Sequence, residues 1–414
     1  MRPERHEAIV RESIVGHGWS ADICPEVTLD DLDSKAIAEL KRRWSEKSCR
    51  PEFLSYSNEK ALHDLNLTHA DGITNAAVLL LGSEKLVAKK LPGAEIIFEW
   101  RQTAGKSTHD FRALWRKAFL IEYEEIWNAI NARNLCVPFH EGLIQREVFA
   151  FHEKSIREAL MNAIAHRDYT KIDRSVFIDA SPEAFLIESP GGFPPGVTID
   201  NVLSAHVWRN RRLMEVLEKI GMVERSGQGM DDIFGFTVAD GKGFPNLEKS
   251  DNSAVRMNIP AIVIDPGFVK FLEQVINEKQ VTLLPDSLFD LERIRVSERP
   301  LNISHVEQWI QLGIIEKVGK TSGMRYILSH RYYQQEKHLG IHTRLTGLTR
   351  DAKKALILEH LKRNGRGSMP EFAEAFPDIK SADISNLLRE LRIENKIQHQ
   401  GSRRIGHWTL ASGS

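Results

Sequence analysis

The sequence predicts an α+β fold, and three stretches carry that prediction. Residues 152–170 have the apolar spacing of a helix that packs against a sheet. Residues 174–179 and 184–189 alternate apolar and polar side chains around Pro182-Glu183, which is typical of a β-hairpin. The last eighty residues give three helical patterns followed by two short strands. Helices and antiparallel strands in separate runs are typical of α+β proteins.

Composition limits the class of protein. A chain of 414 residues predicts two to four domains, and its 42% hydrophobic content is sufficient for packed cores. The formal net charge of -1 provides no global basic signature for nucleic acid. Cys24, Cys49 and Cys136 lie far apart without metal-binding spacing, so reduced cytoplasmic thiols are expected. We find no signal-peptide pattern and no apolar run of about 18 residues, so we expect a cytoplasmic protein without a membrane span.

The first 150 residues predict an accessory region in two parts. Residues 1–70 are expected to form a helical segment, with Thr28 capping a helix that runs to about Trp44 and a linker at 47–53. Residues 71–150 are expected to form an α/β accessory part of the central domain, with a strand at 94–100 and a long amphipathic helix at 110–134.

The candidate catalytic and ligand-binding side chains lie on the helix expected within 152–170. Glu158, Asn162 and His166 are spaced at i, i+4 and i+8, so they share one helix face. A carboxylate and a carboxamide one turn apart can position a water and a hydrated divalent cation beside a phosphate. The alternative is the polar rim of a half-buried helix, which the spacing alone also permits.

Two glycine-rich loops follow this helix. The first, at 190–196, contains Gly191 and Gly192, and the second, at 227–230, contains Gly227 and Gly229 before an expected helix at 231–234. Glycines let backbone N–H groups approach a phosphate, and a helix start adds partial positive charge. These loops therefore favour a phosphate-bearing ligand.

The order of these motifs resembles the nucleotide-binding domain of the GHKL ATPases. More closely, REALMNAIAHRDYT, ESPGGFPPGVT, RNRRLMEVLEKIGMVERSGQGMDDI and TNAAVLLLG are similar to bacterial and archaeal predicted transcriptional regulators. Those regulators combine a Schlafen-type AlbA domain, a divergent GHKL-like (RecG-C-terminal-like) domain and a C-terminal winged helix. The resemblance implies a two-layer α/β sandwich at 151–262 and an AlbA domain that is truncated to a remnant or absent within 1–70.

The resemblance also implies roles for the site residues. ATP and Mg²⁺ would be the cofactors, with Glu158 as general base and Asn162 as the magnesium ligand. His166, the two glycine loops and Ser189 would contact the nucleotide; Ser189 stands nearest the position of the family's adenine-binding aspartate, where it is a weaker acceptor. The alternative is a pseudoenzyme that keeps the fold as a scaffold.

Two winged helix-turn-helix-like domains are expected after residue 262, at 266–332 and 345–412. The region from 336 to 414 carries fourteen basic and nine acidic residues, which favours double-stranded DNA as partner. Helix 381–395 would bury Ile384, Leu387, Leu388 and Leu391. The residues expected to contact DNA lie on its outer face and in the following wing: Ser385, Asn386, Arg389, Arg392, Arg403 and Arg404. Winged helices also serve as protein-interaction modules, and that alternative stays open.

Two functions follow from the sequence. The first is a DNA-binding transcriptional regulator whose GHKL-like domain senses nucleotide, and the second is a DNA-stimulated ATPase with Glu158 as base. Analogy with GHKL and winged-helix proteins adds a homodimer as a candidate assembly. Helicase activity is not favoured, because Gly105-Lys106-Ser107 lacks the preceding glycine of a phosphate loop: position 100 is Trp.

Overall fold

The computed structural model describes residues 18–411 except 142–143, 206, 224–228, 298–302, 319–324, 336–349, 376–380 and 402–405. These residues form two compact units that divide between Val296 and Val306. That division falls within the range 266–332 that the sequence analysis treats as one domain. The domain boundaries inferred from sequence stay predictions.

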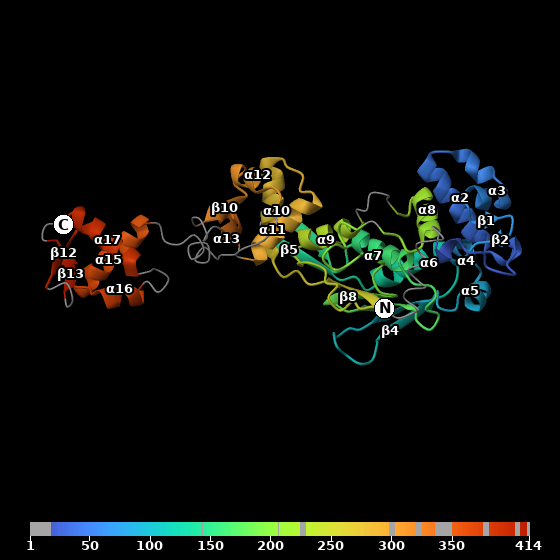
Figure 1. Ribbon diagram of the computed structural model, residues 1–414, viewed down its shortest axis with the longest axis horizontal. Coiled ribbons are helices and arrows are strands. Elements are labelled where there is room, and N and C mark those ends of the chain that lie inside the picture. The colour runs from blue at the N-terminus through green and yellow to red at the C-terminus, as the bar shows by residue number, and fades with distance from the viewer. Residues whose placement is uncertain are drawn as a thin grey trace. The chain divides into compact units, whose positions relative to one another are not determined.

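The first unit is built around a five-stranded mixed sheet (Figure 1). Its order is β4-β3-β7-β8-β9, in which β3 and β7 are parallel and the other neighbours are antiparallel. The strands are β3 (Ile96–Trp100), β4 (Phe111–Trp115), β7 (Val176–Ala180), β8 (Ala184–Pro190) and β9 (Ala254–Pro260). β5 (Cys136–Glu141) and β6 (Ile144–Phe149) form a separate hairpin. The predicted strand at 94–100 and hairpin at 174–189 are confirmed.

Helices cover one face of this sheet. Along β7, Val176, Ile178 and Ala180 are buried while Phe177 and Asp179 are half-exposed, as expected for a sheet with one buried face. α7 (Glu153–Ala165) packs on β8 and on α9 (Gly229–Ala239) on the buried side (Figure 1). The expected α+β class is confirmed, with a helical layer against a mixed sheet.

The N-terminal residues belong to the same core. They form short 3₁₀ turns, helices and a small hairpin: η1 (Trp19–Ala21), η2 (Leu29–Asp31), α2 (Ser34–Ser48), η3 (Pro51–Ser55), α3 (Asn58–Asp64), β1 (Thr68–His69), β2 (Gly72–Ile73), α4 (Asn75–Leu81) and α5 (Glu84–Lys90). α4 is buried at every position and contacts α6 (Phe119–Asn131). This region therefore packs as an integral part of the first unit.

Two N-terminal predictions need correction. Thr28 is an N-cap, as predicted, but it caps the short turn η2, where it bonds Asp31. The helix α2 starts only at Ser34, because the carboxylate of Asp33 accepts from the backbone N–H of Lys35 at 2.7 Å. Residues 47–53 are not a linker, because Phe53 is buried and stacks on Trp44 with ring centroids 3.8 Å apart.

The predicted helix at 110–134 was also wrong in its first half. Phe111–Trp115 forms strand β4, which pairs with β3, and the helix α6 starts only at Phe119. Arg112 and Leu114 are exposed, whereas Phe111 and Trp115 pack against the core. Side chains along these five residues therefore alternate between the two faces, as in a strand. The hydrogen bonds available at the edge of β3 outweigh the local helical pattern.

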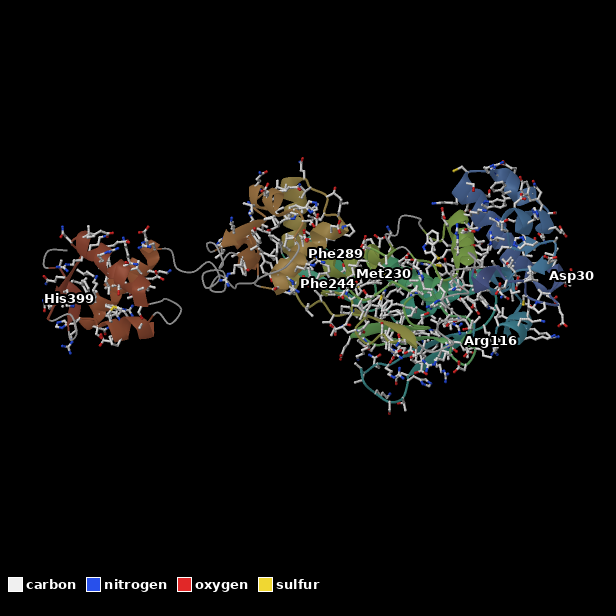
Figure 2. All side chains as sticks on the ribbon, in the orientation of Figure 1. Asp30, Arg116, Met230, Phe244, Phe289 and His399 are labelled. Carbon is white, nitrogen blue, oxygen red and sulfur yellow. The ribbon has the colours of Figure 1, made fainter. Side chains whose placement is uncertain are left out.

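The first unit continues through α8 (Arg211–Lys219), α10 (Pro266–Lys279) and α11 (Pro285–Val296). α11 packs against α9, and Phe289 lies 6.1 Å between ring centroids from both Phe234 and Phe244 (Figure 2). The first helices of the predicted domain at 266–332 are thus attached directly to the helix that begins at Gly229.

The second unit has two groups of elements. The first comprises α12 (Val306–Gln311), β10 (Ile315–Val318), β11 (Arg325–Leu328) and α13 (His330–Gln335), with β10 and β11 antiparallel. The second comprises α15 (Arg350–Asn364), α16 (Met369–Ala375), α17 (Ser381–Ile393), β12 (Ile397–Gln400) and β13 (His407–Leu410). The predicted C-terminal order of three helices and a hairpin is confirmed, and its core holds Ile384, Leu387, Leu388 and Leu391 as expected.

Within the described residues, no helix is both long and apolar enough to cross a membrane. The three cysteines are free thiols; Cys24 is buried, and Cys49 and Cys136 are exposed.

Glu122 on α6 gives a pH-dependent prediction. Its carboxyl is 2% exposed, and burial raises its pKa to about 8 despite the N–H that Lys117 donates to it. The folded state therefore holds a proton that the unfolded chain releases, so the free energy of unfolding falls as the pH rises from about 5 to 8. Glu122→Gln should remove this dependence and stabilise the protein at pH 8, by on the order of 3 kcal/mol.

Denaturant unfolding at pH 5.5 and pH 8 measures this difference. Asp71→Asn, at an exposed turn position whose charge is not among those that shift the pKa of Glu122, is the control and should keep the wild-type slope. Equal pH slopes in wild type and Glu122→Gln would contradict the prediction.

Candidate functional site

A cavity of about 1120 Å³, including its open mouth, lies against α7 and the C-terminal end of β8 in the first unit. α7 presents Glu158 and Asn162 to it one turn apart, and His166 follows at the end of the helix. The segment 192–208, α8, the start of α9 and strand β9 supply the other walls. The lining combines a few polar groups with many apolar side chains, as small-molecule sites do.

Six of the predicted site residues meet in this cavity. They are Glu158, Asn162, His166, Ser189, Gly192 and Gly229. Gly191 lies beside them in the same loop as Gly192, whereas Gly227 lies outside the described residues. The structure brings the polar stripe and both loops together, and the individual roles of these residues stay predictions.

Glu158 lies directly against the first residue of α9. Asn162 Nδ2 donates to Glu158 Oε1 at 3.2 Å. A Cβ atom placed on Gly229 would lie 1.8 Å from the same oxygen, so a larger residue there would require the carboxylate to move aside. A negative group at a helix N-terminus interacts favourably with the helix dipole. The carboxylate of Glu158 therefore occupies the place where an external anion would gain from α9.

His166 is uncharged at neutral pH. Its pKa is lowered to about 4, first by burial and then by the positive charge of Arg209. A neutral imidazole has one donor and one acceptor nitrogen, so it can hydrogen-bond a ligand without attracting a phosphate by charge.

The hydroxyl of Ser189 is buried and donates to the carbonyl of Ala163 at 2.7 Å. Gly191 has φ of +96°, and a Cβ there would lie 2.5 Å from the Cβ of Asp168. A Cβ on Gly192 would lie 2.8 Å from the carbonyl oxygen of Asp251. Close packing within the protein therefore explains both glycines without a ligand.

Arg209 and Asn210 are functional candidates that the sequence analysis missed. The guanidinium of Arg209 donates to His166 O and Gly192 O, both at 2.8 Å, and so connects the helix to the glycine loop. The amide of the buried Asn210 donates to Ala165 O at 2.9 Å and Arg167 O at 2.8 Å. Asn210 precedes α8 as an N-cap residue does, and this was the one signal in the sequence; its side chain bonds α7 instead of capping α8.

The sequence from His166 to Thr170 follows directly after α7, and the bonds made by its side chains explain why these residue types occur there. The buried Arg167 donates to the carbonyls of Asp168 and Lys171 at 3.0 and 2.9 Å. Tyr169 donates its hydroxyl to Ile164 O at 3.0 Å and stacks on Trp19 of the N-terminal region, with ring centroids 4.2 Å apart. Arg167 and Tyr169 fix the end of α7 and are not part of the cavity lining, unlike His166.

The rest of the cavity wall is apolar. It is formed by aliphatic side chains, methionines and two aromatic rings, contributed by Ala159, Ala163, Ile187, Phe193, Pro194, Val197, Val202, Ala205, Val207, Trp208, Met214, Val223, Met230, Leu247, Val255 and Met257. One polar wall facing apolar surfaces suits a planar heteroaromatic group.

The cavity is less suited to a metal ion than to an aromatic ring of a ligand. In the part of the chain that the structure describes, no group of three or more His, Cys, Asp and Glu side chains is placed to hold a cation. Asn162 and Glu158 could contribute oxygen ligands to a magnesium ion that is mainly held by water and phosphate. A dedicated protein cage for Mg²⁺ is not formed by the described residues.

The candidate DNA-contacting residues lie in the second unit. On α17, Ser385, Arg389 and Arg392 are exposed, and Asn386 is half-buried. Ser385 donates its hydroxyl back to Ser381 O at 2.9 Å. Arg403 and Arg404 lie outside the described residues.

Comparison with known proteins supports an ATPase-like central domain. Residues 173–259 match the family described as "Putative ATP-dependent DNA helicase recG C-terminal". Residues 7–97 match a domain of unknown function, DUF8451. No curated protein matches the chain.

One solved structure shows the same fold over much of the chain. The DIP2311 protein from Corynebacterium diphtheriae is 19% identical, with a TM-score of 0.62, and the alignment covers 80% of this chain and 68% of that one. The family match indicates an ATPase-like domain of the RecG-C-terminal type at residues 173–259. The truncated AlbA segment expected within 1–70 stays a prediction.

The bonds of Asn210 predict a measurable loss of stability. Asn210→Ala should leave two buried carbonyls at the end of α7 without their donor, at a cost of about 1–3 kcal/mol. Denaturant unfolding measures it. Asn128→Ala, at an exposed position of α6, is the control and should change the stability by less than about 0.5 kcal/mol. Equal effects of the two substitutions would show that the bonds of Asn210 contribute nothing specific.

Proposed function

We propose that this protein is a DNA-binding transcriptional regulator whose ATPase-like domain senses a nucleotide. The observation that carries the proposal is the convergence of Glu158, Asn162, His166 and Ser189 on one cavity, which α7 forms together with residues of the ATPase-like segment 173–259. Three of them lie along α7 and at its C-cap, and Ser189 comes from β8.

The cavity supports the sensing part of the proposal. Its polar wall offers a carboxylate, a carboxamide, a neutral imidazole and a hydroxyl, and its apolar walls offer surface for a base. ATP with Mg²⁺ is the proposed ligand. When bound, Mg²⁺ would neutralise phosphate charge, and Asn162 is the residue that would contact it.

The C-terminal group of elements supports the DNA-binding part. Three helices followed by an antiparallel hairpin are the order of a winged helix-turn-helix, in which the third helix enters the major groove. Among the described residues, Arg389 and Arg392 form no ion pair, whereas the basic Arg350 and Lys354 of α15 both pair with Glu390. The exposed arginines of α17 are thus available to phosphates or base edges.

A route for coupling begins at α9. This helix starts at the cavity with Gly229 and packs against α11, which precedes the second unit along the chain. A ligand that shifts the start of α9 would therefore act on α11 through Phe234 and Phe289. Such coupling requires that the ligand favours one of two arrangements of these helices.

Calorimetric titration of the full chain with ATP and Mg²⁺ tests the sensing proposal. We expect saturable binding to wild type and at least a tenfold loss, about 1.4 kcal/mol, in Asn162→Ala. Asn128→Ala is the control and should bind like wild type. No heat of binding at millimolar nucleotide would leave the ATPase-like domain as a scaffold.

Salt-dependent DNA binding tests the other half. Arg389→Ala combined with Arg392→Ala should weaken binding to double-stranded DNA. It should also reduce the slope of log affinity against log salt by about 1–2, because each lost phosphate contact removes about 0.9 from the slope. Arg363→Ala, which removes a basic residue paired with Glu359 on α15, is the control. An unchanged slope in the double variant would show that α17 does not contact DNA.

The alternative function is a DNA-stimulated ATPase with Glu158 as general base. The hydrogen bond from Asn162 to Glu158 favours it, because it orients the carboxylate within the cavity. DNA-stimulated release of phosphate that is lost in Glu158→Ala, with ATP binding retained, would support this function. A homodimer stays a proposal that sedimentation can test.

A further inference from the structure

The strand β4 is one of the two edge strands of the five-stranded sheet (Figure 1). It pairs with β3 on one side, and among the described residues no segment pairs with its other side. The opposite edge strand, β9, is protected, because Asn258 exchanges two backbone hydrogen bonds with Asn246, at 2.8 and 2.9 Å. An unpaired edge presents a row of backbone N–H and C=O groups with which another chain can pair.

The side chains of β4 also lack a neighbour on that side. Phe111 and Trp115 point toward the core, yet each is only half-buried. Their direct partners on β3, Trp100 and Ile96, are 5% and 2% exposed. Leu114, on the other face of the sheet, is 50% exposed. The edge of β4 therefore leaves apolar surface uncovered on both faces of the sheet.

The sequence of β4 does not protect this edge. Natural edge strands are commonly blunted by a proline, a lysine or a bulge. Phe111–Trp115 contains neither proline nor lysine, and its register with β3 is regular. The charged side chain of the strand is Arg112, which lies 3.6 Å from Glu99 on β3. Such a strand is suited to pair with a further strand.

The strand is complementary to a second copy of itself. A two-fold axis perpendicular to the sheet would join two β4 strands antiparallel, with one residue opposite its own copy. When that residue is Ala113, Phe111 lies opposite Trp115 of the second copy. On the other face, Arg112 lies opposite Leu114 of the second copy. All five residues of β4 are then paired.

Charge excludes the neighbouring registers. Of the registers that pair at least three residues of each β4, two others preserve the two-fold axis. Centring on Arg112 would place the two copies of this arginine directly opposite each other. Centring on Leu114 would place Arg112 opposite Arg116 of the second copy. Like charges directly opposite each other are destabilising, so the register centred on Ala113 is the favoured one.

From these observations we propose that two copies of this chain associate through β4 in the register centred on Ala113, which joins their sheets into one. Backbone hydrogen bonds between the two strands provide the pairing. An aromatic pair on the core-facing side, and Arg112 over Leu114 on the other side, set the register. This association needs neither nucleotide nor DNA, so it is tested apart from the function proposed above.

Sedimentation equilibrium of the full chain, over roughly 1–100 µM, tests the proposal. We expect a monomer–dimer equilibrium in wild type. Leu114→Lys places a positive charge opposite Arg112 of the second copy and should weaken dimerisation by at least about tenfold. Leu114→Glu places a negative charge there and should dimerise within about threefold of wild type. Leu54→Lys, at a leucine of η3 that is 53% exposed, is the control and should change nothing.

A disulfide tests the register directly. Ala113 lies opposite its own copy, so the two β-carbons would be about 4.5–5.5 Å apart. Ala113→Cys should therefore link two copies under mild oxidation, in clear excess over wild type. Wild type has the exposed thiols of Cys49 and Cys136 and provides the background. Adding Leu114→Lys should reduce the linked fraction.

Each part of the proposal has an outcome that would overturn it. A monomer at every concentration would overturn the association and assign the edge of β4 to another occupant. A dimer that Leu114→Lys leaves intact would place the interface elsewhere on the chain. Equal weakening by Leu114→Lys and Leu114→Glu, or no link above background in Ala113→Cys, would overturn the register.

Discussion

Five consecutive carbonyl groups at the C-terminal end of α7 accept hydrogen bonds from side chains of the loops and strand around it. Ser189 donates to Ala163 O, Tyr169 to Ile164 O, Asn210 to Ala165 O and Arg167 O, and Arg209 to His166 O. The last carbonyls of a helix have no partners within the helix, and a buried carbonyl without one is costly. This set of bonds satisfies them all, and it joins the end of α7 to β8 and to the residues that lead into α8.

The same set of bonds connects the cavity to the N-terminal region. Tyr169 stacks on Trp19, and the backbone N–H of Leu213 on α8 donates to Ser20 at 3.4 Å. A Cβ on Gly18 would lie 2.7 Å from the carbonyl oxygen of Arg209, so the chain passes very close to the residue that holds the glycine loop. The region that matches a domain of unknown function thus packs against the residues that hold the cavity, and the two share one hydrophobic core.

Local patterns predicted much of the fold, and long-range bonds explain the failures. The hairpin at 174–189 follows from alternation around Pro182-Glu183, and the stripe of Glu158, Asn162 and His166 follows from helical spacing. β4 was missed because Phe111–Trp115 fits a helical pattern as well as an alternating one, and only its pairing with β3 decides. Arg209 and Asn210 could not be found, because their partners lie more than forty residues earlier and no local pattern identifies a side chain that bonds a distant carbonyl.

Three glycines were predicted to lie at the ligand site, and they do lie at or beside the cavity. The structure gives a different reason for glycine at some of these positions. Gly191, Gly192 and Gly229 were selected because glycine lets a backbone approach a phosphate, and all three lie at or beside the cavity. Two of them are explained by a neighbour within the protein, because the Cβ of Asp168 lies against Gly191 and the backbone of Asp251 lies against Gly192. At Gly229 the near atoms belong to the flexible end of Glu158, which can move aside. Gly229, at the start of α9, is therefore the one of the three whose selection for close approach of a ligand to a helix N-terminus still applies.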